Sequence, residues 1–119
     1  MRVGNITFRA PAVPTPPGEI GPTERRIREL IKFLSYPRGD VRVQTGELAL
    51  EIARAIDHHD PTPSGDYRSP GWLLGYVLED LASFPNDPAS KLTEIRLRTA
   101  RRWWSATRTT NPQGAQHHE

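Results

Sequence analysis

The four histidines and their acidic neighbours are the first residues in this chain that could bind a metal ion or move protons. They form two similar clusters, His-His-Asp at residues 58–60 and His-His-Glu at residues 117–119. A zinc site needs three or four ligands that converge on one point, whereas adjacent residues on a helix point in different directions. The chain also lacks a His-Glu-x-x-His or cysteine pattern. We therefore expect no metal site and no cofactor, and we interpret His58 and His59 as a helix C-terminus, where positive charge is favourable.

Carboxylates are the second source of chemistry, because general acid–base catalysis needs them in a cleft with shifted pKa values. The candidates on predicted helices are Glu47, Glu51, Glu79 and Asp80. Glu47 and Glu51 share one helical face, but we expect that face to be solvated. The chain contains no Walker A, GxSxG or GxGxxG pattern, and its apolar fraction of 35% allows only a small core. The sequence therefore predicts a protein that is not an enzyme.

A basic segment towards the C-terminus is the best candidate for a binding surface. We predict a helix over residues 88–107, with Leu92, Ile95, Thr99 and Trp103 on its buried face. The rest of this helix carries basic side chains that could bind nucleic-acid phosphates: Lys91, Arg98, Arg101, Arg102 and Arg108. Arginine binds phosphate through two parallel hydrogen bonds, and a nearby tryptophan stacks on bases or packs against a partner. The alternative is an amphipathic helix whose arginine face is only solvated.

Trp104 is the second feature of this segment. It does not share a helical face with Trp103, so we expect it to be exposed and to contact a partner. The charge distribution leaves the partner open. Residues 1–39 carry +4, residues 40–87 carry −6, and residues 88–119 carry +4. Either the basic ends bind an external polyanion, or they pair with acidic residues such as Glu79 and Asp80 of the same or a neighbouring chain.

The helices that position these residues are short and separated by prolines. We expect an all-α fold: a small four-helix domain at residues 23–108, an extended Pro-rich arm at 1–22 and a flexible polar tail at 109–119. The predicted helices cover residues 23–35, 45–57, 70–84 and 88–107. Thr23 is the expected cap of the first, and residues 41–43 could form a short strand before the second. Five of the first 22 residues are proline, so we expect the arm to be flexible and dispensable for folding.

The third predicted helix begins at Ser69-Pro70 and is the most apolar part of the chain. Its apolar residues form a wide stripe at helical spacing, so we expect the other helices to pack around it. The residues of that stripe are Leu73, Leu74, Val77, Leu78, Leu81 and Phe84. The second helix has its own buried stripe, which consists of Leu48, Ile52, Ala55 and Ile56.

Composition also limits the setting of the protein. The chain has no cysteine, no apolar run long enough to span a bilayer, and no secretory signal at its start. We therefore expect a cytoplasmic protein that does not contact a membrane.

Three segments resemble a known family. They are LALEIARAID (Leu48–Asp57), WLLGYVLEDLASF (Trp72–Phe84) and the basic LTEIRLRTARRW (Leu92–Trp103). Together they resemble the short terminase small subunits of phages that infect actinobacteria. This resemblance covers about half of the chain and implies a non-catalytic oligomer that recognises double-stranded viral DNA and passes it to the motor subunit. Residues 1–39 have no counterpart in the family. The alternatives are a helical protein–protein interaction module, such as a virion connector or host-protein inhibitor, and a small transcriptional regulator.

Overall fold

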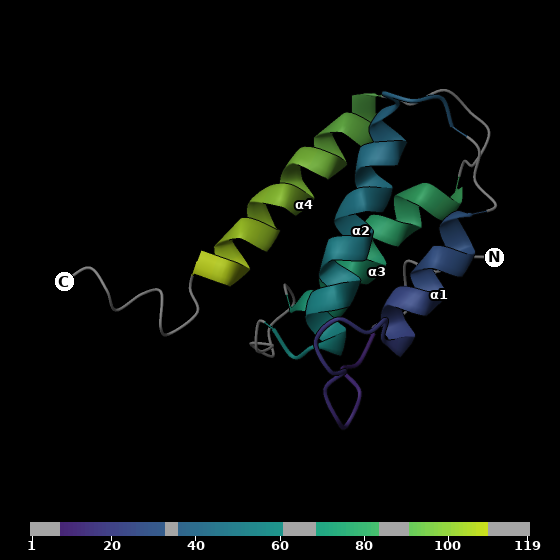
Figure 1. Cartoon of the computed structure of the whole chain (residues 1–119). Coiled ribbons are helices and arrows are strands. Elements are labelled where there is room, and N and C mark those ends of the chain that lie inside the picture. The colour runs from purple at the N-terminus through teal and green to yellow at the C-terminus, as the bar shows by residue number, and fades with distance from the viewer. Residues whose placement is uncertain (1–7, 33–35, 61–68, 84–90, 110–119) are drawn as a thin grey trace.

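The computed structural model describes residues 8–32, 36–60, 69–83 and 91–109, and within these ranges there are four helices and no strand. Figure 1 shows them as α1 (Pro22–Ile31), α2 (Val41–Asp57), α3 (Pro70–Ser83) and α4 (Lys91–Thr109). The predicted all-α fold is confirmed. Residues 1–7, the predicted helix boundaries at 35, 84 and 88, and residues 110–119 lie outside the described ranges.

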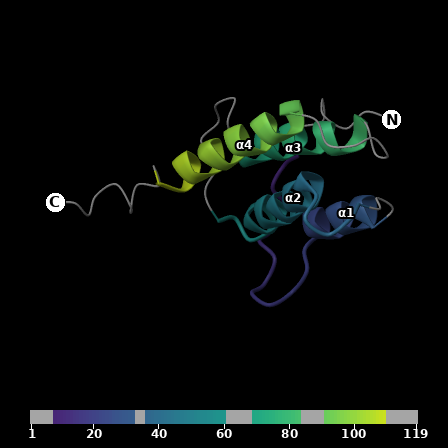
Figure 2. The ribbon, with the colours of Figure 1, turned by 90° about the horizontal axis from the view of Figure 1, so that it is seen from above.

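The helices form two layers, with α1 and α2 in one and α3 and α4 in the other (Figure 2). α2 packs against each of the other three helices, whereas α3 packs against α2 and α4. The expectation that all the helices surround α3 is therefore wrong, and α2 holds that position. α2 can contact three neighbours because two of its alanines, Ala49 and Ala53, are fully buried and allow close approach.

The predicted core stripes of α2 and α3 are confirmed among the described residues, whereas Phe84, the last residue of the predicted α3 stripe, lies outside them. On α3, Leu73, Leu74, Val77, Leu78 and Leu81 are all at most 3% exposed. The expected start of α3 is also correct, because the Ser69 hydroxyl accepts a hydrogen bond from the Trp72 amide at 3.3 Å and Pro70 is the first helical residue.

α2 begins at Val41, four residues before the predicted start, so the residues proposed as a short strand are helical. Its cap is Asp40, whose Oδ1 accepts a hydrogen bond from the Arg42 amide at 2.8 Å. The Arg42 guanidinium also pairs with Asp40 Oδ2 at 2.9 Å and lies 3.9 Å from the centre of the Tyr36 ring. The hydrogen bond from Arg42 lowers the pKa of Asp40 and outweighs the effect of burial. This local cap overrides the β-preference of the two valines.

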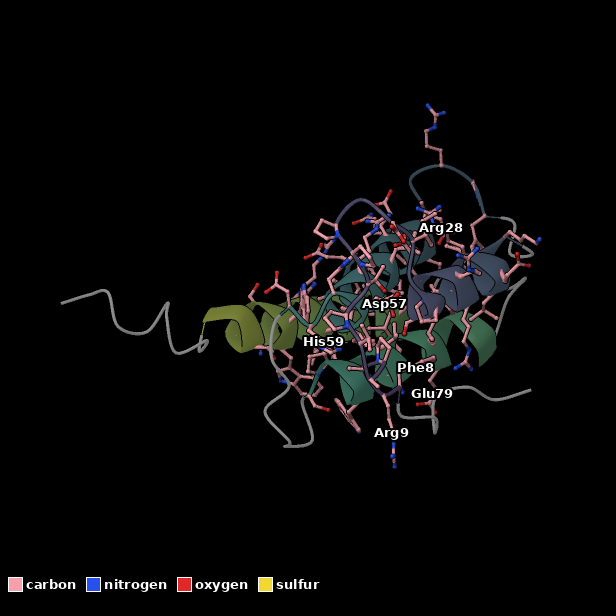
Figure 3. The ribbon with its side chains drawn as sticks, turned by 60° about the horizontal axis from the view of Figure 1, so that its bottom comes forward. Phe8, Arg9, Arg28, Asp57, His59 and Glu79 are labelled. Atoms are coloured by element: carbon pink, nitrogen blue, oxygen red, sulfur yellow. The ribbon has the colours of Figure 1, made fainter. Side chains whose placement is uncertain are left out.

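The first described segment, residues 8–21, has no helix or strand, turns at Pro17-Gly18 and contacts the helices, and we call it the N-terminal strap. Phe8 is buried, and its amide donates to the Gly71 carbonyl of α3 at 3.4 Å. The Arg26 guanidinium lies 5.0 Å from the centre of the Phe8 ring, while Arg9 points outward (Figure 3). Gly71 has to be glycine here, because a Cβ on it would collide with the Phe8 carbonyl oxygen.

The C-terminus of α2 binds the middle of the strap. The Thr15 amide donates to the Asp57 carbonyl at 2.8 Å, and His58 Nδ1 lies 2.8 Å from the Thr15 carbonyl oxygen. His59 Nε2 lies 2.7 Å from the Pro11 carbonyl oxygen. Because a carbonyl only accepts, both histidine nitrogens donate. The expectation of a flexible arm is therefore wrong for residues 8–21, whose backbone is hydrogen-bonded to α2 and α3. The expectation that the arm is dispensable for folding stays a prediction.

α1 is capped by a residue from another helix. Gly21 occupies the N-cap position and Pro22 the first helical position, so the prediction of Thr23 as cap is wrong. The two carboxylate oxygens of Asp57, which is fully buried at the end of α2, accept hydrogen bonds from the Thr23 and Glu24 amides at 3.0 and 2.9 Å. Figure 3 shows Asp57 between the strap and α1. A Cβ on Gly21 would collide with this carboxylate.

A second buried carboxylate joins α1 to α2. The Glu24 side chain is 4% exposed, and its Oε2 accepts hydrogen bonds from Nε of Arg28 and Nε of Arg54, each at 3.0 Å. Burial raises the pKa of Glu24, but the hydrogen bonds and charges of the two arginines outweigh burial, so its pKa lies below the ordinary value of 4.5. The ionised form is therefore the one that stabilises the α1–α2 contact.

We expect this carboxylate to make the fold sensitive to acid. Because the folded-state pKa of Glu24 is depressed, its contribution is complete above an unfolded-state pKa near 4.5 and is lost as pH falls through the lower folded-state value. The test is the melting temperature of wild type and of Glu24→Gln between neutral pH and pH 3. At neutral pH the variant should melt at a lower temperature than wild type, and its melting temperature should fall less on acidification. Parallel curves would show that Glu24 does not carry the acid response.

Candidate nucleic-acid interface

α4 packs on the other helices through a different face from the predicted one. Its buried residues are Thr93, Leu97, Ala100 and Trp104, all at most 7% exposed. The predicted buried stripe instead faces outward: Leu92 is 55% and Ile95 is 45% exposed, and Thr99 and Trp103 are partly buried. Both stripes have helical spacing, so periodicity alone could not separate them.

Trp104 decides which stripe is buried. It is 3% exposed, and its indole Nε1 donates to Glu51 Oε2 of α2 at 2.7 Å. A buried tryptophan needs a hydrogen-bond acceptor for its N–H. Glu51 is that acceptor, although Glu51 itself is exposed. The prediction that Trp104 is exposed is therefore wrong. Because the predicted partner contact of Trp104 rested on that exposure, it has no support.

The described α4 residues that we predicted to bind phosphates are exposed, as that role requires. Lys91, Arg98, Arg101 and Arg102 are all exposed, whereas the Arg108 side chain lies outside the described residues. Lys91, Arg98 and Arg102 are seven and four residues apart, so they form one row along the helix. We call these three residues the basic row. Arg101 turns towards α2, where its Nη2 donates to Gln44 Oε1 at 3.0 Å.

The basic row keeps most of its charge available. Lys91 Nζ lies 3.6 Å from Glu94 Oε1, but both side chains are at least half exposed, so this pair is weak. Within the part of the chain that the structure describes, no acidic group pairs with Arg98 or Arg102. Their guanidinium groups are therefore available for an external anion. Of the two acidic residues proposed to contact such arginines, Glu79 is partly buried on α3 and the Asp80 side chain is outside the description.

An aromatic cluster lies on the α3 side of α4. The Trp72 and Tyr76 rings stack at 5.4 Å, and Trp103 packs against them at 5.6 and 5.4 Å between ring centres. The Arg96 guanidinium lies 5.4 Å from the centre of the Tyr76 ring. Sequence reasoning missed this cluster. The available signal was the four-residue spacing of Trp72 and Tyr76 on the side of α3 opposite its core stripe.

The histidine and carboxylate candidates do not gather into a comparable site. Among the described residues, no group of three or more His, Cys, Asp or Glu side chains is placed to hold a metal ion. His58 instead binds the strap and lines a hollow of about 430 Å³ with Glu51, Arg54 and Asp60. Both acidic residues there are exposed, whereas acid–base chemistry at neutral pH favours a buried carboxylate. We therefore place the candidate site on α4.

None of the described helices is both long enough and apolar enough to cross a membrane. Comparison of the chain with protein-family models, characterised proteins and solved structures finds no match.

Proposed function

We propose that this protein is a non-catalytic accessory protein that binds double-stranded DNA through α4. The observation that supports this function is the basic row: Arg98 and Arg102 share an exposed face with Lys91 and have no acidic partner among the described residues. Arginine is well suited to phosphate because its planar fork donates two parallel hydrogen bonds.

The geometry favours contacts with the DNA backbone over contacts with bases. Along the helix axis, Lys91 lies about 10 Å from Arg98, and Arg98 lies about 6 Å from Arg102, at 1.5 Å per residue. A row of cations with this spacing follows one edge of a duplex, where phosphate contacts supply affinity but no sequence information. Binding should therefore depend strongly on salt and weakly on sequence.

The narrower form of this proposal is a role in packaging phage DNA. Its support is the resemblance of residues 48–57, 72–84 and 92–103 to short terminase small subunits, which implies a homo-oligomer that works with a motor subunit. In that setting the protein would act in the cytoplasm of the bacterial host, and α4 would supply general affinity for DNA.

Replacing Arg98 and Arg102 with alanine should weaken binding to every duplex sequence. Each lost phosphate contact removes about 0.9 from the slope of log affinity against log salt, so the double variant should flatten that slope by about two. The measurement is fluorescence anisotropy of a labelled short duplex across a salt series, with light scattering to follow oligomer mass.

Arg25→Ala with Arg38→Ala is the matched control, because both residues are exposed and lie outside α4, and the net charge falls equally. This control should bind DNA with a slope close to that of wild type. Equal losses in the two variants would mean that net charge alone attracts DNA. A changed oligomer mass with unchanged DNA affinity would assign the arginines to a subunit contact instead.

A further inference from the structure

α4 carries a second apolar stripe, which the described residues leave partly exposed. It consists of Leu92, Ile95, Thr99 and Trp103, and we call it the outer stripe. Leu92 and Ile95 are 55% and 45% exposed, and the other large hydrophobic residues on the described helices are less exposed. The spacing of three, four and four residues is that of a helix face that packs against another helix.

The outer stripe is complementary to itself when two α4 helices are antiparallel. With the crossing point midway between Ile95 and Thr99, each Ile95 lies opposite the partner's Thr99. Leu92 then lies within one residue of the partner's Trp103. Trp103 is only partly buried by the rings of α3, so it has surface left for a leucine. A second copy therefore fits the stripe along its whole length.

The same arrangement brings two basic rows together. Arg102 follows Ile95 by seven positions, so the basic row runs along one edge of the outer stripe. In a symmetric antiparallel pair, each flank of one helix lies beside the same flank of the other. The pair therefore presents three cations from each copy on one side. In a parallel pair the two basic rows would lie on opposite sides, and one duplex could not contact both.

The size and charge of this contact make it dependent on DNA. The outer stripe is about 17 Å long and one helix width of about 10 Å across, so it offers on the order of 200 Å² of each copy. Stable interfaces bury about 800 Å² of each partner. The two basic rows also repel each other until phosphates lie between them. Both properties favour a pair that forms on a duplex and not in its absence.

One basic row is a small site by itself. It offers at most three phosphate contacts, and one of its cations, Lys91, also lies 3.6 Å from Glu94 Oε1. A second copy doubles the number of contacts. The twofold axis of the antiparallel pair passes through its basic side, and a duplex has twofold axes that relate its two antiparallel strands. Each copy can therefore contact one strand in the same way.

We propose that two copies of the protein pair antiparallel through the outer stripe when they bind one duplex, so that DNA binding is cooperative. This inference rests on the proposed function. It adds the occupant of the outer stripe, which is a second copy, and the condition for its binding, which is DNA. The DNA site is complete only when the partner copy contributes the second basic row.

The test is titration of a short labelled duplex with the full-length protein, with native mass spectrometry to separate complexes of one and two copies. On wild type, the second copy should bind about tenfold more tightly than the first, or more, which is a typical coupling between two sites. Leu92→Ser with Ile95→Ser should bind both copies independently, with the wild-type affinity for the first. Without DNA, this variant and wild type should have the same mass.

Val13→Ser with Ile20→Ser is the matched control. Both residues are exposed, at 75% and 48%, and lie on the strap instead of α4. This control should keep the cooperativity of wild type. Melting temperatures of all variants should match that of wild type, because each change is on the surface.

Disulfide cross-linking tests the orientation, because the chain has no cysteine of its own. A disulfide joins residues whose Cα atoms lie within about 7 Å. On the duplex, Ile95→Cys mixed with Thr99→Cys should form the mixed disulfide. Leu92→Cys alone should form none, because antiparallel helices keep its two copies about 15 Å apart along the axis. A disulfide at Leu92→Cys would mean a parallel pair and would overturn the proposal.

The outcomes separate this inference from the proposed function. Wild type that binds the duplex without cooperativity, or a serine variant as cooperative as wild type, would overturn the pairing and leave DNA binding intact. A serine variant with a weaker first copy would assign the outer stripe to the DNA contact instead. A difference in mass without DNA would overturn the dependence on DNA. Wild type that binds no duplex at all would remove the proposed function, and this inference with it.

Discussion

Replacing Asp57 with alanine should lower the free energy of unfolding by roughly 3–5 kcal/mol, because a hydrogen bond to a charged group contributes about 1.5–3 kcal/mol and this carboxylate accepts two from α1. The alanine leaves the amides of Thr23 and Glu24 without their acceptors, and both residues are buried. For a small domain this is a large share of the total stability. The measurement is urea denaturation followed by circular dichroism, with the free energy taken from the midpoint and slope.

Asp60→Ala is the control for the Asp57 variant, because Asp60 lies three residues later and is exposed. We expect it to unfold at nearly the same urea concentration as wild type. The free energy of unfolding of Asp57→Asn should lie between those of Asp57→Ala and Asp60→Ala, because an amide keeps one acceptor oxygen but loses the charge. If Asp57→Ala and Asp60→Ala were equally stable, the cap would not stabilise α1.

Replacing Leu81 with alanine should destabilise the fold by about 2–5 kcal/mol, the usual range for a leucine in a packed core. Leu81 is 1% exposed on the central stripe of α3. The loss combines removed apolar contacts with a cavity that the surrounding helices cannot fully close. Thermal unfolding and urea denaturation should both report it.

Leu92→Ala makes the same chemical change on the surface and is the matched control. Leu92 is 55% exposed, so this variant should stay within about 0.5 kcal/mol of wild type. The pair also tests the orientation of α4. Comparable losses at both positions would show that α4 buries Leu92 after all.

Sequence reasoning succeeded where the determining interactions are local. The stripe of α3 is wide, and Ser69-Pro70 marks its start, so only one face could be buried. α4 was harder because it has two stripes at helical spacing. The choice between them depends on Glu51, a residue on another helix that accepts the Trp104 N–H. Periodicity describes one helix and cannot represent that contact.

The strap and the cap of α1 depend on contacts between distant residues. The proline content of residues 11–17 argued against a helix, and the structure has none over these residues. Nothing in the composition indicated that Phe8 would be buried or that His59 would bind Pro11. Asp57 did carry a signal, because a carboxylate is unfavourable at a helix C-terminus unless it serves another group. That group is the N-terminus of α1.

The position of Asp57 limits when α1 can form its native cap. α1 has ten residues, fewer than the roughly 12–15 that an isolated helix needs in water. The carboxylate that caps it comes 33 and 34 positions after the amides it binds. During synthesis, α1 therefore leaves the ribosome before its cap exists. Thr15 and Pro11 of the strap also have their hydrogen-bond partners at this end of α2, in Asp57 and His59. The contacts of α1 and the strap with the end of α2 can therefore form only after residue 57 has been synthesised.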